Sequence, residues 1–256
     1  MPDASCRCCG SAHPHPPAQD RPAGQGWGRR RFAAAGLLAA TAALAPASGR
    51  TAEVVARTSL TPDQALRQLQ DGNDRFLTEA PFRSTQGRER RVELARGQAP
   101  FAVLVGCSDS RVPPELLFGR GLGELFIVRN AGNTIDTAAL GSVEYGVGVL
   151  GCPLVVVLGH EGCGAVAAAL DVVERNAVFP GVIGEMVQPI IPAVLSVRGA
   201  AGDPLDNAVR ANARRVATRL ATQSGILRDA VAAGRLRIVA ARYDLDDGDV
   251  DWLDAG

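Results

Sequence analysis

Two apolar segments of the chain each end in side chains that bind transition metals. The segment 103–106 leads into Cys107, and the segment 154–159 leads into His160, with Cys163 three residues further on. Short apolar runs without polar alternation indicate strands that are buried on both faces, as in a parallel sheet. Open α/β sheets bind their ligands beyond the carboxyl ends of such strands. Two thiols and one imidazole at these ends predict a Zn2+ site with three protein ligands and one open position.

A carboxylate and a guanidinium follow Cys107 at alternate positions, as Asp109 and Arg111. If the backbone stays extended past residue 106, these three side chains point to one side. Asp109 is then either a fourth metal ligand or a bidentate partner of Arg111, which leaves the fourth position to water. The sequence leaves both arrangements open.

Strand-like and helical segments alternate through residues 58–256, which are expected to form one catalytic domain. This order predicts an α/β fold with a central, mostly parallel four-stranded sheet flanked by helices. We expect strands at 103–106, 124–129, 154–159 and 235–241, with at most a short edge strand starting at Trp252. We expect helices at about 62–78, 87–96, 114–118, 137–150, 164–175, 185–198 and 204–222.

Residues 1–57 have the composition of a leader segment without ordered structure. Three arginines and Phe32 follow Gly28, and an uncharged run at 33–45 leads to a small-residue site at 45–47. This arrangement is typical of a secretory signal and resembles a twin-arginine signal, although Gly28 and Ala33 depart from that pattern. It predicts export to the periplasm, the alternative being a cytoplasmic protein with an Ala-rich tail. The run is too short to span a bilayer, so no stable membrane span is expected.

The leader also holds three cysteines, for which the sequence indicates either a metal site or no role: Cys6, Cys8 and Cys9. Elsewhere, Cys152 is expected to be a small buried apolar residue, and Glu161 a solvated charge in a loop. The chain has 27 basic (Lys+Arg) and 27 acidic (Asp+Glu) residues. Without a basic excess, nucleic acid is not an expected partner.

Four motifs together resemble the β-class carbonic anhydrases over about residues 60–253. They are CSDSR at 107–111, RNAGN at 129–133, HEGCG at 160–164 and GRLRIVAARYDLDDG at 234–248. The resemblance implies reversible hydration of CO2 to bicarbonate and a proton, with Zn2+ as cofactor. It also implies Cys107, His160 and Cys163 as the zinc ligands and Asp109 and Arg111 as the catalytic pair.

The resemblance further implies a substrate pocket. Gln98, in a Gly-Gln-x-Pro turn, would donate to bicarbonate, and Phe126 and Tyr145 would line the pocket. The backbone N–H of Gly164 is expected to face a bound anion, because it stands at a helix start. In the family such residues come partly from a neighbouring subunit, so a homodimer or a higher homo-oligomer is implied.

Two other functions use the same zinc site. One is a relative that hydrolyses carbon disulfide or carbonyl sulfide, which would differ in its access tunnel. The other is a zinc-binding sensor without turnover, which would be expected to lack Asp109, Arg111 or Gln98, whereas this chain has all three.

Overall fold

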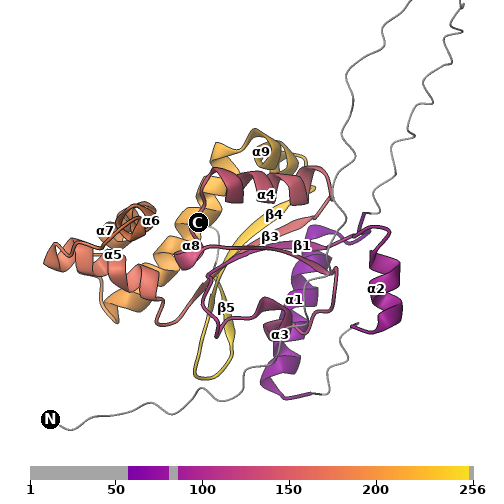
Figure 1. The fold of residues 1–256 in the computed structure, drawn as a ribbon, viewed down its shortest axis with the longest axis horizontal. Helices are drawn as coiled ribbons and strands as arrows, with labels where there is room; N and C mark the ends of the chain where they lie inside the picture. Colours follow the sequence, from indigo (N-terminus) through magenta and orange to yellow (C-terminus); the bar gives the residue numbers. More distant parts are fainter. Residues whose placement is uncertain (1–56, 81–85, 254–256) are drawn as a thin grey trace, which may run out of the picture. The chain divides into compact units, whose positions relative to one another are not determined.

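A computed structural model describes residues 57–80 and 86–253 of the chain (Figure 1). These residues form a five-stranded sheet in the order β2-β1-β3-β4-β5, with helices on both faces. The strands are β1 (Ala102–Gly106), β2 (Leu125–Arg129), β3 (Leu154–His160), β4 (Arg237–Tyr243) and β5 (Val250–Leu253). The α-helices are α1 (Pro62–Leu77), α2 (Arg88–Leu94), α3 (Pro114–Leu117), α4 (Thr137–Gly148), α5 (Gly164–Arg175), α6 (Ile183–Val187), α7 (Ile191–Ser196), α8 (Pro204–Gln223) and α9 (Gly225–Ala232), and two short 3-10 helices are η1 (Ala131–Asn133) and η2 (Gln188–Ile190).

Strand β1 lies between β2 and β3 and runs parallel to both. In this register Gly106, the last residue of β1, is opposite Leu158 of β3 and Arg129 of β2. The carboxyl ends of β1 and β3 are therefore neighbours on one edge of the sheet. This arrangement brings Cys107 and His160 to the same place, although 53 positions separate them in the sequence.

Alternate residues of the central strands enter two different apolar cores. Val103, Val105 and Val157 pack with residues of α4, α8 and α9 on one face of the sheet. Leu104 and Leu158 pack on the other face with residues of α1 and α3, and Figure 1 shows these two helix layers on opposite sides of the strands. Because every residue of β1 and β3 is buried, the expectation of strands covered on both faces is confirmed.

The prediction of a four-stranded sheet was one strand short. Beyond β4, the chain turns through an acidic loop in which the Asp244 carboxylate accepts from the backbone N–H of Asp246, at 3.0 Å. The N–H of Asp244 in turn donates to the carbonyl of Asp249, at 2.9 Å. So tight a connection returns the chain antiparallel to β4, which is how β5 joins the sheet edge.

The helices follow the expected positions except in two places. The helix expected at 185–198 is interrupted, as α6, η2 and α7, because Pro189 and Pro192 lack the N–H that a continuous helix needs. Helix α9 was not expected, and it begins where the hydroxyl of Ser224 accepts from the N–H of Leu227. The Ser224 cap separates α9 from the long helix α8, which sequence periodicity alone does not mark.

The leader expected over residues 1–57 lies, apart from Arg57, outside the described residues, as do Cys6, Cys8 and Cys9. Within the described part of the chain, no helix is both long enough and apolar enough to cross a membrane.

Candidate metal centre

Three side chains with soft donor atoms meet at the edge where β1 and β3 end. Cys107 follows β1, His160 ends β3, and Cys163 caps the N-terminus of α5. All three are buried, and their donor atoms lie within 4.8 Å of one another. The two Sγ atoms are 4.0 Å apart. This is the size and chemistry of a site for one thiolate-preferring cation.

A backbone N–H group contacts one of the two sulfur atoms. The N–H of Gly132 donates to Cys107 Sγ at 3.3 Å, while Cys163 occupies the N-cap position of α5. A hydrogen bond from Cys163 lowers the pKa of Cys107 most strongly, and the N–H of Gly132 adds to this effect. The pKa of Cys163 is raised, because its proton is shared with Cys107 and burial disfavours a second negative charge. Cys107 is therefore favoured as a thiolate, which is the form that binds a metal cation.

His160 is completely buried, and its two ring nitrogens have different surroundings. Nδ1 lies 2.8 Å from the backbone carbonyl of Glu161. Nε2 has no hydrogen-bond partner among the described residues. A buried imidazole nitrogen without a partner is costly, so a metal ion at Nε2 fits this position, with Nδ1–H donating to the carbonyl.

Asp109 and Arg111 face each other through a turn and not through an extended chain. Strand β1 stops at Gly106, and the Asp109 carboxylate accepts from the backbone N–H of Arg111 at 2.9 Å. The guanidinium binds both carboxylate oxygens, with Nε at 3.0 Å and Nη2 at 2.7 Å. The condition of an extended chain over residues 107–111 is thus not met, because an aspartate-centred turn forms there instead.

The pairing leaves Asp109 next to the three donors but outside their cluster. One carboxylate oxygen of Asp109 is 3.9 Å from Nε2 of His160. The hydrogen bond from Arg111 holds the pKa of Asp109 well below its usual range, against the opposing effect of burial. Asp109 is therefore a carboxylate at neutral pH, and it is committed to Arg111 in this arrangement.

Arg129, at the end of β2, was not singled out by the sequence analysis. Its Nε donates to the carbonyl of Cys107 at 2.7 Å, and its Nη2 donates to the carbonyl of Asp109. It thus fixes the backbone of the turn that carries both residues. The sequence feature that could have indicated Arg129 is a charged residue at the end of a mostly apolar strand.

Comparison with known proteins identifies the family. The family described as "Carbonic anhydrase" matches residues 102–250. The chain is 42% identical over 190 residues to a carbonic anhydrase of Mycolicibacterium smegmatis. The matched residues make up 74% of this chain and 92% of that protein. It is 41% identical over 187 residues to carbonic anhydrase 2 of Mycobacterium tuberculosis, covering 73% and 90%. Among solved structures, it resembles a tetrameric β-carbonic anhydrase from Sordaria macrospora, with a TM-score of 0.57, 27% identity and coverage of 64% and 85%. The chain belongs to the β-class carbonic anhydrases.

This carbonic anhydrase therefore catalyses the reversible hydration of CO2 to bicarbonate and a proton. The Cys-His-Cys set is the type of site that holds zinc in the β class. The residues present fit that ion, because two buried sulfurs and the unpartnered Nε2 of His160 converge within one coordination sphere.

The expected pocket residues of this β-class carbonic anhydrase lie apart from the three donors. Gln98 is exposed and lines a separate hollow with Leu94 and Gly123. Phe126 and Tyr145 pack on each other, with ring centroids 6.1 Å apart, and Tyr145 is 48% exposed. No hydrogen bond among the described residues joins Gln98 or Tyr145 to the Cys-His-Cys set. Gly164, in contrast, is exposed at the first position of α5, directly after Cys163.

A cleft of about 460 Å³ is lined by sequence neighbours of the metal-centre residues. Its lining includes Ser108, the neighbour of Cys107 in the chain, and Ala131, the neighbour of Gly132. Residues of α6 also line it, including Glu185 and Met186. None of the three donor residues is among the lining residues of this cleft.

The expectations about Cys152 and Glu161 had different outcomes. Cys152 is buried in an apolar core, and this burial raises the pKa of its thiol to about 12, so its assignment as a small apolar residue is confirmed. Glu161 was expected to be a solvated charge in a loop, which is correct only in part, because it lies in a turn but its partly exposed carboxylate also has polar partners. Its carboxylate accepts from the N–H of Leu245 at 3.1 Å and lies 3.8 Å from the Arg242 guanidinium.

Proposed function

We propose that Cys107, His160 and Cys163 bind the catalytic zinc ion, and that Asp109 and Arg111 are the catalytic pair. The convergence of three buried donor atoms within 4.8 Å carries the proposal. The donor set favours zinc over magnesium or calcium, because those ions prefer oxygen ligands.

When bound, zinc supplies a Lewis acid that makes water a nucleophile at neutral pH. The chain's own residues then orient the attacking oxygen. Arg111 holds the Asp109 carboxylate in a bidentate pair, with one oxygen 3.9 Å from Nε2 of His160. From there Asp109 can accept a hydrogen bond from the attacking oxygen and fix its direction. Its pairing with Arg111 would keep Asp109 from coordinating a bound zinc ion, so that a coordination position would remain for the reactants.

The proposal is tested by metal analysis together with stopped-flow CO2 hydration of the purified full chain. One zinc per chain is expected, and removal of zinc with a chelator should abolish hydration until zinc is restored. A metal-free preparation that hydrates CO2 at the same rate would contradict the proposal.

We further propose that the chain works as a homodimer or a higher homo-oligomer, in which Gln98, Phe126 and Tyr145 serve the metal centre of a neighbouring subunit. The solvent exposure of Gln98 and Tyr145 supports this, because neither is engaged by the metal centre of its own chain. The related Sordaria macrospora enzymes are tetrameric. Gly164, in contrast, would offer its N–H to bicarbonate within the same chain.

Mixed dimers test the shared site. Gln98→Ala should lower CO2 hydration about tenfold, the value of one lost hydrogen bond of about 1.4 kcal/mol. A mixed dimer of Gln98→Ala with Cys163→Ala contains one complete site, since the second chain supplies Gln98 to the intact metal centre of the first. We expect about half the wild-type activity from mixed dimers purified with two affinity tags. If the activity does not exceed the mean of the two parent variants, Gln98 does not act across subunits.

We also propose that residues 1–57 are an export leader, because Arg29, Arg30 and Phe32 precede an uncharged run. Lysine at both Arg29 and Arg30 should keep the precursor in the cytoplasm, as measured by cell fractionation. Equal amounts of periplasmic enzyme with and without the substitutions would contradict a twin-arginine route.

A further inference from the structure

The residue that follows the metal-site histidine contacts a charged cluster at the carboxyl end of β4. One carboxylate oxygen of Glu161 accepts from the N–H of Leu245, at 3.1 Å, and the other lies 3.8 Å from Nη2 of Arg242. The side chain of Glu161 is only 36% exposed. These contacts hold one turn, after β3, against another, after β4.

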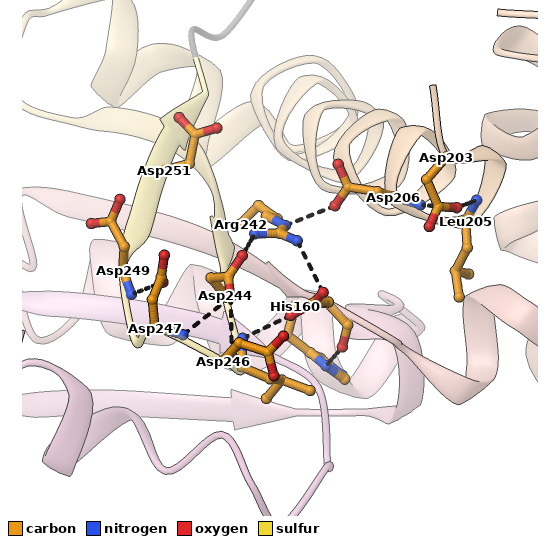
Figure 2. A network of polar contacts seen from close by, with 12 residues as sticks. His160, Asp203, Leu205, Asp206, Arg242, Asp244, Asp246, Asp247, Asp249 and Asp251 are labelled. Carbon is orange, nitrogen blue, oxygen red and sulfur yellow. Dashed lines mark hydrogen bonds and ion pairs between the residues drawn. The ribbon is translucent and has the colours of Figure 1, made fainter. Parts of the chain in front are cut away.

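Arg242 is a rigid anchor for this connection. Its guanidinium is almost buried, and its Nε donates to Asp206 of α8 at 2.7 Å, while Nη1 donates to Asp244. Figure 2 shows Arg242 between these two aspartates, with His160 close by. A buried cation is costly unless it is paired on several sides, so Arg242 has little freedom to move.

The cluster reaches the metal centre through the backbone of Glu161. The N–H of Glu161 donates to the carbonyl of Tyr243 at 2.9 Å, and its carbonyl lies 2.8 Å from Nδ1 of His160. Only Nε2 of the ring is then free for a metal, and the direction of Nε2 depends on where this carbonyl stands. Glu161 is thus held by its side chain and its N–H while its carbonyl holds the histidine.

We infer that Glu161 is a positioning residue for the zinc centre. Its carboxylate, tied to Leu245 N–H and Arg242, keeps its own carbonyl in place, and the carbonyl keeps Nε2 of His160 directed at the two thiols. The inference rests on the proposed role of His160 as a zinc ligand. It adds a side chain that neither contacts the metal nor the substrate.

The test compares zinc affinity in three variants of the full chain, measured by competition with a chromogenic chelator. Glu161→Ala removes both side-chain contacts and should raise the zinc dissociation constant about tenfold, within the range for residues that support a ligand. Glu161→Gln keeps an acceptor for Leu245 N–H and should recover most of the affinity. Asp171→Asn is the matched control, because Asp171 is a half-exposed carboxylate that pairs with Arg175 of the same helix, α5, and not with Arg242 or the Glu161 turn. It should stay within about twofold of wild type.

A second measurement reports ligand geometry directly. The visible absorption of the cobalt(II)-substituted protein should shift in Glu161→Ala and stay unchanged in Asp171→Asn, because only the first variant lets the imidazole rotate. Wild-type zinc affinity and an unchanged cobalt spectrum in Glu161→Ala would overturn the inference. An equal loss of zinc affinity in Glu161→Ala and in the control variant would overturn it as well. If the wild-type chain itself binds no zinc, the proposed metal site fails as well, which is a distinguishable result.

Discussion

Replacing Cys163 with alanine is expected to remove the zinc and to lower CO2 hydration by at least about 10³-fold, since the ion supplies several kcal/mol of charge stabilisation. Only Cys107 and His160 would remain as donors, and two donors hold zinc poorly. The fold should persist, because the sheet is covered by two apolar cores that do not include Cys163. Metal content per chain, stopped-flow hydration and the far-UV circular dichroism spectrum measure these three outcomes.

Cys152 provides the matched control for this substitution. It is also a buried free cysteine, but it lies in the apolar core beside α4, with Sγ 3.3 Å from the carbonyl of Pro100. Cys152→Ala should cost about 1 kcal/mol of stability and leave both zinc content and activity at wild-type levels. One zinc per chain in Cys163→Ala, or a loss of zinc in Cys152→Ala, would contradict the assignment of the site.

Asp109→Asn is expected to lower CO2 hydration about 100-fold while zinc stays bound. The amide cannot pair with both nitrogens of Arg111 as a charged bidentate acceptor, so the orienting group next to His160 is lost. Because the pKa of Asp109 is lowered, wild type keeps the carboxylate ionised from neutral to alkaline pH. The ratio of wild-type to variant activity should therefore be the same at every pH in that range.

Asp63→Asn is the control for Asp109→Asn. Asp63 also pairs with an arginine, Arg237, at 2.9 Å, but this pair lies on the surface between α1 and β4. Its loss should not affect activity, and the change in stability should stay below about 1 kcal/mol. A zinc-free Asp109→Asn protein would show that Asp109 holds the metal, and full activity would exclude it from catalysis.

The location of the metal centre was predictable because it depends on two general properties of parallel sheets. Strands without polar alternation are buried, and their carboxyl ends meet on one edge, so Cys107 and His160 had to approach each other once both runs were strands. The donor chemistry could be inferred from residue types alone. Cys163 followed from its short distance to His160 in the sequence.

The details around those donors depend on turns and long-range contacts that no local pattern encodes. The turn at Asp109 is set by its side chain, which accepts from the backbone N–H of Arg111 and so competes with an extended path. Glu161 looked like a surface charge because its partners, Leu245 and Arg242, lie more than 80 positions away. Strand β5 was not counted in the predicted sheet for a similar reason, since its four residues form a strand only by pairing with β4.

The placement of the donors on neighbouring strands has a consequence for how the enzyme is made. During synthesis Cys107 leaves the ribosome 56 residues before Cys163, and it has no second donor until β3 pairs with β1. The cation can be captured tightly only by a chain whose central sheet is already assembled. Binding of zinc by all three donors therefore requires that β1 and β3 are paired, and zinc in turn stabilises that pairing.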